Sequence, residues 1–170
     1  MGESLHDKWF NEASALWDKG HIKEAFRLFL AAAKAGDSSS QVNVGFFYDT
    51  GLGVKKSRTQ AMYWYRRALR RGSISAATNI GTIYRDEGRL RLAIRWFEKA
   101  AALGDDDAML SMARLYMGPL KDPTKARRLL RKVLASRNVT EDSQEQAEQL
   151  LEQLRQNPTA APRWERRSTR

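Results

Sequence analysis

The sequence predicts an all-α fold, a right-handed superhelical solenoid of about four helix pairs closed by a C-terminal capping helix. One alanine recurs with spacings of 36, 32 and 33 residues, at Ala25, Ala61, Ala93 and Ala126. The spacings of 36 and 32 also separate three tyrosines and three glycines, Tyr48, Tyr84 and Tyr116, and Gly36, Gly72 and Gly104. Such periods are typical of stacked helical hairpins, each of which buries its apolar face against its neighbour.

A glycine hinge and two helix-start motifs predict the first two helix pairs. The first pair lies near Leu5–Lys19 and Ile22–Ala35, and Gly20 separates its helices. In the second pair, Ser38-x-x-Gln41 predicts a capping box for a helix that runs to Tyr48. Ser57-x-x-Gln60 predicts the start of the partner helix, which ends at Gly72.

The later pairs are expected from glycine stops and acidic caps. The third pair covers Ser75–Glu87 and Leu90–Leu103. In the fourth pair, the acidic residues at positions 105–107 cap one helix and Asp122-Pro123 opens the next. The apolar stripe of Thr140–Gln156 predicts the capping helix. Residues 1–157 then form one domain, with repeats at about 5–36, 37–72, 73–104 and 105–138 and the cap at 140–156, followed by a flexible basic tail over 158–170.

The second pair resembles a known helical repeat. Tyr48, the turn Gly51-Leu-Gly-Val54, the segment Ala61-Met-Tyr-Trp-Tyr65 and the closing Gly72 follow the order of a Sel-one-like repeat, a relative of the tetratricopeptide repeat. Weaker copies extend the resemblance over about residues 5–135. It implies antiparallel helix pairs that mediate protein–protein contacts, as an adaptor, a regulator or an antitoxin-like immunity protein, and it implies no catalysis.

In this family, the first helix of each pair lines a concave groove. Applied copy by copy, this rule predicts a partner-binding groove lined by Phe10, Ser14, Trp17, Asp18, Val42, Phe46, Asp49, Thr78, Thr82, Arg85, Asp86, Leu110, Arg114 and Met117. Aromatic residues beside Asp and Arg are typical of interface anchors. The alternative for Phe10 and Phe46 is packing between adjacent helices, because aromatic residues at helical spacing usually belong to the core.

The middle of the chain is strongly basic. Residues 55–135 carry 19 basic and 7 acidic side chains, whereas residues 1–54 carry 5 and 7. The expected second helices carry cations at spacings of four, which places each set on one helix face. We call this set the basic face: Arg66, Arg67, Arg70, Arg71, Arg91, Arg95, Lys99, Arg128 and Lys132.

Such a field favours an acidic partner, whether a protein, a nucleic acid or an anionic membrane, and of these we expect an acidic protein. Two alternatives stay open. The cations could form a solvated surface that keeps the protein soluble, or they could bind nucleic acid, although the aromatic interleaving typical of single-strand binders is missing.

The sequence predicts no catalytic site, cofactor or metal site. His6 and His21 are the only histidines and form no metal-binding pair. The chain has no cysteine and no apolar stretch of ~18 residues, and it shows no secretory signal. We therefore expect a non-enzymatic cytoplasmic interaction module, with a nucleic-acid-associated protein as the alternative.

Overall fold

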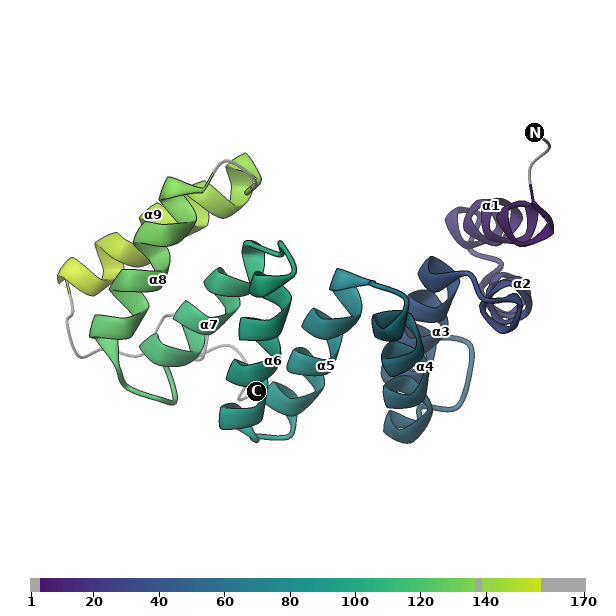
Figure 1. Ribbon diagram of the computed structural model, residues 1–170, viewed down its shortest axis with the longest axis horizontal. Coiled ribbons are helices and arrows are strands. Elements are labelled where there is room, and N and C mark those ends of the chain that lie inside the picture. Colours follow the sequence, from purple (N-terminus) through teal and green to yellow (C-terminus); the bar gives the residue numbers. More distant parts are fainter. Residues whose placement is uncertain (1–3, 137–138, 157–170) are drawn as a thin grey trace. The chain divides into compact units, whose positions relative to one another are not determined.

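The computed structural model describes residues 4–136 and 139–156, and all regular secondary structure in these ranges is helical (Figure 1). This confirms the predicted all-α repeat fold. The basic tail predicted for residues 158–170 lies outside the described residues. The helices in these ranges are α1 (Leu5–Asp18), α2 (Ile22–Ala35), α3 (Ser38–Thr50), α4 (Arg58–Arg70), α5 (Ile74–Asp86), α6 (Leu90–Ala102), α7 (Asp107–Met117), α8 (Pro123–Ala135) and α9 (Glu141–Gln156).

The chain divides into two compact units, and the boundary falls inside α5. Unit 1 (Met1–Ile83) contains a run of neighbours in which α1 packs on α2, α2 on α3 and α3 on α4. Unit 2 (Tyr84–Arg170) contains a second run, from α6 through α7 and α8 to α9. The single domain expected over residues 1–157 stays a prediction.

The recurring alanines lie where helices approach each other. All four are fully buried, and so are the aromatic residues that follow three of them by four positions, Phe29, Tyr65 and Phe97. Small side chains let helix axes come within roughly 8–10 Å of each other. The burial agrees with the close packing that the repeated alanines predict.

The second helices of the second and fourth pairs start where the sequence predicts. The Ser57 hydroxyl accepts a hydrogen bond from the backbone N–H of Gln60 at 3.3 Å, at the start of α4. At the start of α8, the Asp122 carboxylate accepts one from the backbone N–H of Lys125 at 3.0 Å.

The start of α3 differs from the prediction. Asp37 rather than Ser38 is the N-cap, and its carboxylate accepts a hydrogen bond from the backbone N–H of Ser40 at 2.5 Å. Because the helix starts one residue earlier than expected, Gln41 does not complete a capping box. It is buried instead, and its Nε2 donates to the carbonyl of Ala33 in α2 at 3.1 Å.

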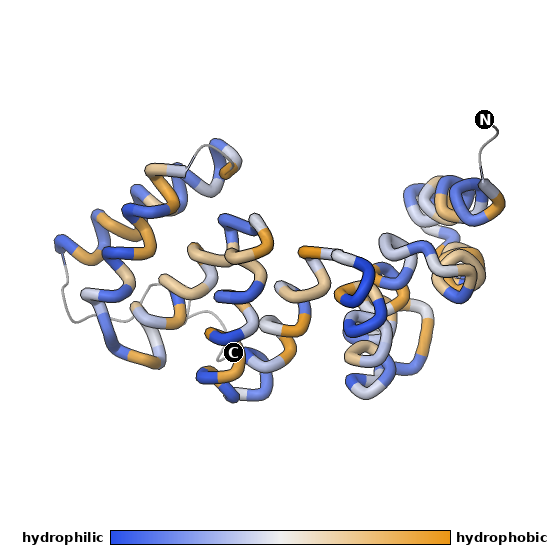
Figure 2. Tube along the Cα trace, in the orientation of Figure 1, coloured by the Kyte–Doolittle hydropathy of each residue, from blue (hydrophilic) through white to orange (hydrophobic). Residues whose placement is uncertain are grey.

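Each unit has its own apolar core. The core of unit 1 gathers α1, α2, α3 and α4 around Phe29 and Phe47. In unit 2, Ala147, Leu150 and Leu154 of α9 pack on α7 and α8. Figure 2 shows apolar and polar positions following one another along the turns of α8 and α9, as expected of helices that are buried on one side.

Candidate partner-binding face

The residues predicted to line a groove lie on the first helix of each pair. In unit 1 they come from α1, α3 and the part of α5 that ends at Ile83, and in unit 2 from the end of α5 and from α7. Within each unit the structure brings a different subset together, aromatic in unit 1 and cationic in unit 2.

The aromatic subset joins the end of α1 to α3. The rings of Trp17 and Phe46 are stacked, with centroids 5.7 Å apart and an angle of 26° between their planes. Trp17 is half-buried and also meets Phe29 and Phe47 edge to face, at 5.9 and 4.8 Å. Phe46 is 36% exposed. Trp17 and Phe46, which we call the aromatic platform, therefore present one exposed ring that a second ring anchors to the core.

Other predicted residues of unit 1 are occupied by contacts inside the unit. Phe10 is half-buried, and its ring packs edge to face on Phe29 at 5.7 Å. The Asp49 carboxylate forms a salt bridge with Arg58 Nε at 3.2 Å, so its charge is compensated within unit 1. The remaining members are the exposed Asp18 and the half-buried Ser14, Val42, Thr78 and Thr82.

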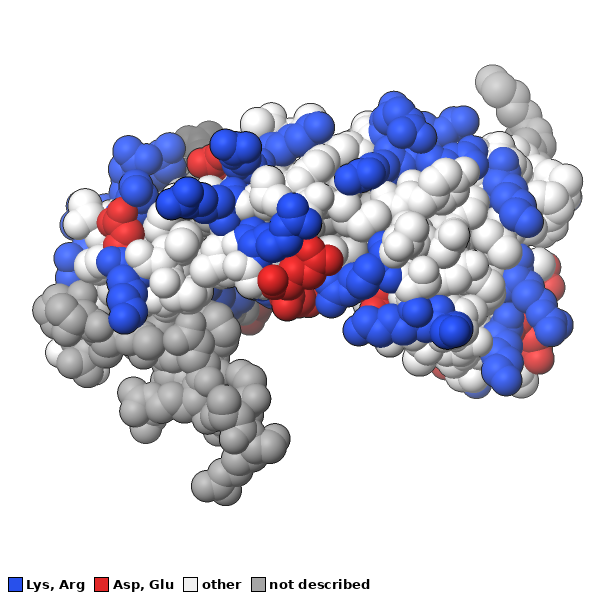
Figure 3. All heavy atoms as spheres, turned by 90° about the horizontal axis from the view of Figure 1, so that it is seen from below, with Lys and Arg blue, Asp and Glu red and all other residues white. Residues whose placement is uncertain are grey.

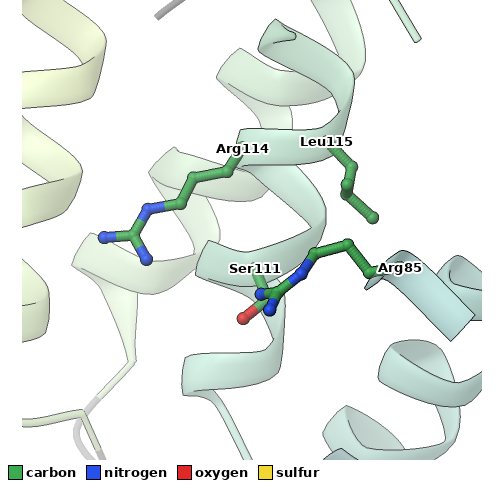
Figure 4. A pocket seen from close by; sticks show the side chains of 4 residues that line it. All are labelled: Arg85, Ser111, Arg114 and Leu115. Atoms are coloured by element: carbon green, nitrogen blue, oxygen red, sulfur yellow. The ribbon is translucent and has the colours of Figure 1, made fainter. Parts of the chain in front are cut away.

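The cationic subset lines a hollow in unit 2. Arg85, from the end of α5, and Ser111, Arg114 and Leu115, from α7, surround a volume of about 340 Å³ (Figure 4). The guanidinium group of Arg85 forms a salt bridge with Asp86 at 2.9 Å. We call this site the arginine hollow.

The second arginine of the hollow is held by the capping helix. Arg114 is half-buried, and its Nη2 donates a hydrogen bond to Gln146 Oε1 of α9. Burial lowers the pKa of the Arg114 guanidinium, the charge of Arg85 lowers it further, and Asp142 of α9 opposes both effects. Because Arg85 is already paired with Asp86, a carboxylate that enters the hollow would add to this ion pair or replace it.

Leu110 and Met117 correct the prediction for unit 2. They are only 4% and 5% exposed and belong to the core that α7, α8 and α9 share. The family rule places both on the groove side of α7. In this chain α9 packs on α7, so these two side chains serve the capping contact rather than a partner.

Sequence reasoning missed Ser111, Leu115 and Gln146. Ser111 lies three residues before Arg114 and four before Leu115, so the helical spacing of α7 would have found both once the arginine was chosen. Gln146 carried no such signal, because it belongs to a helix outside the repeats.

The basic face is mostly exposed, and Figure 3 shows that Lys and Arg outnumber Asp and Glu on the side of the molecule drawn there. Within the ranges that the structure describes, none of the nine cations forms a salt bridge with an acidic side chain. Two of them lie over aromatic rings: Arg67 is 5.3 Å from the Trp64 ring centre, and Lys99 is 5.1 Å from that of Trp96.

One member of the basic face has a neighbour in another repeat. The guanidinium group of Arg71 lies against Gly36, the left-handed residue that ends α2, where an added Cβ would meet Nη2 at 3.0 Å. A cation at the C-terminal end of a helix is favoured by the helix dipole. Arg71 therefore contributes to the packing of unit 1.

Among the described residues, no cluster of three or more His, Cys, Asp or Glu side chains is arranged to hold a metal ion. None of the described helices has the length and apolar character needed to cross a membrane.

Known proteins share this arrangement. The Oxalobacter formigenes Sel1 repeat protein superimposes with a TM-score of 0.62 at 26% identity, over 76% of this chain and 56% of that one. The protective antigen c5321 of uropathogenic Escherichia coli gives a TM-score of 0.55 at 22% identity, over 95% of this chain and 47% of that one, which shows the fold alone.

The sequence comparisons agree with the structural ones. A putative sel1-like repeat-containing protein of Acanthamoeba polyphaga mimivirus is 31% identical over 85 residues, which are 50% of this chain but 16% of that relative. The model of the Sel1 repeat matches residues 22–37, 38–73, 76–105 and 106–132. These four matches cover more than half of the chain, which therefore belongs to the Sel1 repeat family.

Proposed function

We propose that this protein is a non-enzymatic interaction module that binds a partner protein through the first helices of its repeats. Sel1 repeat proteins generally mediate protein–protein interactions and are typically non-catalytic. The observation that carries the proposal is the aromatic platform, because it presents an exposed ring that is stacked on a second ring packed against the core.

The platform has the physical properties of an interface anchor. A ring that is already stacked loses little conformational freedom when a partner covers it, so most of the apolar burial becomes binding energy. Anchors of this kind are typically aromatic or arginine residues, surrounded by contacts that exclude water. Phe46 can supply such a contact from α3 while Trp17 keeps its ring in place.

The arginine hollow adds a second contact area with a chemical preference. Its two guanidinium groups favour a partner segment that carries carboxylates, since Arg pairs well with planar anions. The net positive charge of residues 55–135 acts in the same direction at longer range. The proposed partner is therefore a protein with an acidic surface, and the proposed location is the cytoplasm.

The experiment compares what the platform captures from lysates of the source organism. Wild-type protein, Phe46→Ser and Leu52→Ser are immobilised, and bound proteins are identified by mass spectrometry. Leu52 is the matched control, because it is 37% exposed but lies in the turn between α3 and α4. The proposal expects a protein retained by the wild type and Leu52→Ser but lost with Phe46→Ser. Equal retention on all three would contradict it.

The same experiment decides between narrower roles. An antitoxin-like immunity protein would retain one effector, whose activity falls when the complex forms. A nucleic-acid-associated protein would instead retain proteins that disappear after nuclease treatment, and this would replace the proposal.

A further inference from the structure

Unit 2 has a second hollow, on the side formed by the second helices α6 and α8. It encloses about 310 Å³, near the lower end of the roughly 300–1,000 Å³ typical of ligand pockets. The exposed Lys125, Arg128 and Lys132 of α8 stand at its rim, and Met109, Met112 and Tyr116 of α7 form its floor. We call it the α6–α8 cleft, and none of its described lining residues also lines the arginine hollow.

Two of the three rim cations form no salt bridge with the described residues. Lys125, Arg128 and Lys132 are spaced by three and four residues, which puts them on one face of α8. Of these three cations, only Lys125 forms a salt bridge with a described residue, which is Asp122 at 2.9 Å. Of the described residues that line the cleft, only Glu98 of α6 is acidic, so cations outnumber carboxylates among them. Arg128 and Lys132 are therefore available to an acidic ligand.

The floor of the cleft favours a ligand that carries an apolar group next to its acidic groups. Met109 is half-buried and Met112 is almost fully buried, and thioether side chains adapt to apolar groups of different shapes. A ligand with carboxylates alone would leave this apolar surface in contact with water. Both requirements are met by a peptide in which an apolar side chain lies next to Asp or Glu.

The same floor disfavours nucleic acid. Single-strand binders stack bases on exposed aromatic faces. Among the described residues that line the cleft, Tyr116 is the only aromatic one, and the Lys125 ammonium lies over its ring, 5.2 Å from the ring centre. A base would have to displace this cation before it could stack.

We propose that the α6–α8 cleft binds a short acidic segment of a protein, with an apolar side chain placed on Met109 and Met112 and carboxylates placed against Arg128 and Lys132. This site goes beyond the proposed function, because it lies on different helices from the aromatic platform. It gives part of the basic face a directional role in addition to long-range attraction.

The test measures binding of a labelled peptide by fluorescence anisotropy, with the full chain at physiological salt. The probe alternates Glu–Asp pairs with Leu and Phe, and a second probe carries Ser in place of Leu and Phe. The cleft variant is Arg128→Glu with Lys132→Glu. Its matched control is Arg91→Glu with Arg95→Glu, which changes the net charge equally on exposed residues of α6 that do not line the cleft.

The proposal expects the cleft variant to raise the Kd of the first probe about tenfold or more, and the control to raise it about twofold or less. The Ser probe should also bind about tenfold more weakly than the first probe, because it leaves the floor uncovered. Met109→Gln, which keeps every charge, should weaken the first probe but not the Ser probe. Circular dichroism checks that each variant is folded.

Three results would overturn the proposal. The first is that the wild type does not bind the first probe. Equal weakening by the cleft variant and its control would show general charge attraction. Tighter binding of single-stranded nucleic acid than of the peptide, lost in the cleft variant, would make the cleft a nucleic-acid site. Phe46→Ser should leave the peptide affinity unchanged, which separates this site from the proposed function.

Discussion

Gly45 of α3 lies directly against the ring of Tyr65 in α4. A Cβ added at Gly45 would come within 2.5 Å of Tyr65 Cε1 and 2.6 Å of Cδ1, a separation that real Cβ atoms essentially never show. Tyr65 is fully enclosed, and burial raises the pKa of its hydroxyl. Because the ring is buried and lies directly on the Gly45 backbone, we expect this contact to limit how closely the two helices of the second pair approach.

We therefore expect Gly45→Ala to lower the free energy of unfolding by about 1–3 kcal/mol, the usual cost of overpacking a core. Helix propensity acts in the opposite direction by about 1 kcal/mol, since alanine is the better helix former. Net destabilisation in a urea titration would show that the clash with the ring is the larger effect.

A double-mutant cycle separates the ring from other causes. In a Tyr65→Leu background the ring atoms are gone, so adding Gly45→Ala should cost less than it does in the wild type, by about 1 kcal/mol or more. An equal cost in both backgrounds would mean that the tyrosine ring does not limit the approach of α3 and α4.

Phe46 and Phe47 are neighbours in sequence with different expected roles. Phe47 is fully buried between α1, α2 and α3, so Phe47→Ala should cost about 3–5 kcal/mol of stability. Phe46→Ala should cost about 1 kcal/mol, because its ring is partly exposed. The affinity for the partner should change in the opposite order: Phe46→Ala should lose partner binding, whereas Phe47→Ala should keep it as long as the variant is folded. A partner that binds Phe46→Ala with wild-type affinity would place the interface elsewhere.

The fold could be predicted from the sequence because every repeat must meet the same packing constraint. Ala25, Ala61 and Ala93 recur at positions where only a small side chain fits, and this constraint is visible as spacing. The capping helix was equally visible, since Leu150 and Leu154 lie on one stripe.

The site was less visible, because it depends on which side chains the tertiary packing leaves exposed. Spacing places Phe46 and Phe47 on adjacent helix positions but does not say that Trp17 stacks on one and packs edge to face on the other. The family rule also placed Leu110 and Met117 in the groove, because a rule that holds for an internal repeat takes no account of a capping helix on the last one.

The capping helix should stabilise unit 2 chiefly through Leu154. This side chain is buried in the core with Leu130 of α8, and Arg127 Nη2 donates to the Leu154 carbonyl at 2.8 Å. Leu154→Ala should therefore lower the free energy of unfolding by about 2–5 kcal/mol. Glu148→Ala, on the exposed side of α9, is the control and should change it by less than about 0.5 kcal/mol. Similar thermal unfolding of both variants would mean that α9 does not contribute to the core.

The cap of α8 should make a small part of the stability depend on pH. The backbone N–H of Lys125 donates to the Asp122 carboxylate, and this bond, aided by the Lys125 side chain, holds the pKa of Asp122 below its ordinary value. As the pH falls, the Asp122 carboxylate is therefore protonated at a higher pH in the unfolded chain than in the folded protein. The stabilisation is therefore present above about pH 4, the ordinary range of an aspartate, and is lost as the pH falls through the lower folded pKa.

We expect the wild type to melt at a higher temperature than Asp122→Ala at pH 7, and this difference to shrink as the pH falls below about 4. Asp122→Asn keeps a cap that does not titrate, so its difference from Asp122→Ala should stay constant over the same range. A difference between the wild type and Asp122→Ala that is the same at both ends of the titration would mean that the carboxylate charge does not stabilise α8.

The part of the basic face on α6, which is Arg91, Arg95 and Lys99, should accelerate encounter with an acidic partner more than it strengthens the final complex. Arg91 and Arg95 are exposed and have no salt bridge with the described residues, so their charge is felt over about a Debye length, ~8 Å at physiological salt. Changing Arg91, Arg95 and Lys99 to Glu should lower the association rate constant, most strongly at low salt, and leave the dissociation rate constant almost unchanged. Stopped-flow mixing at several salt concentrations measures both rate constants.

Nucleic acid would behave differently, because each neutralised phosphate releases a counterion. When six to ten phosphates are contacted, the affinity falls by about 10³–10⁵ between low and moderate salt. Sub-micromolar binding of random DNA or RNA that survives physiological salt would show that these cations bind phosphates directly, and nucleic acid would then replace the acidic protein as the expected partner of this face.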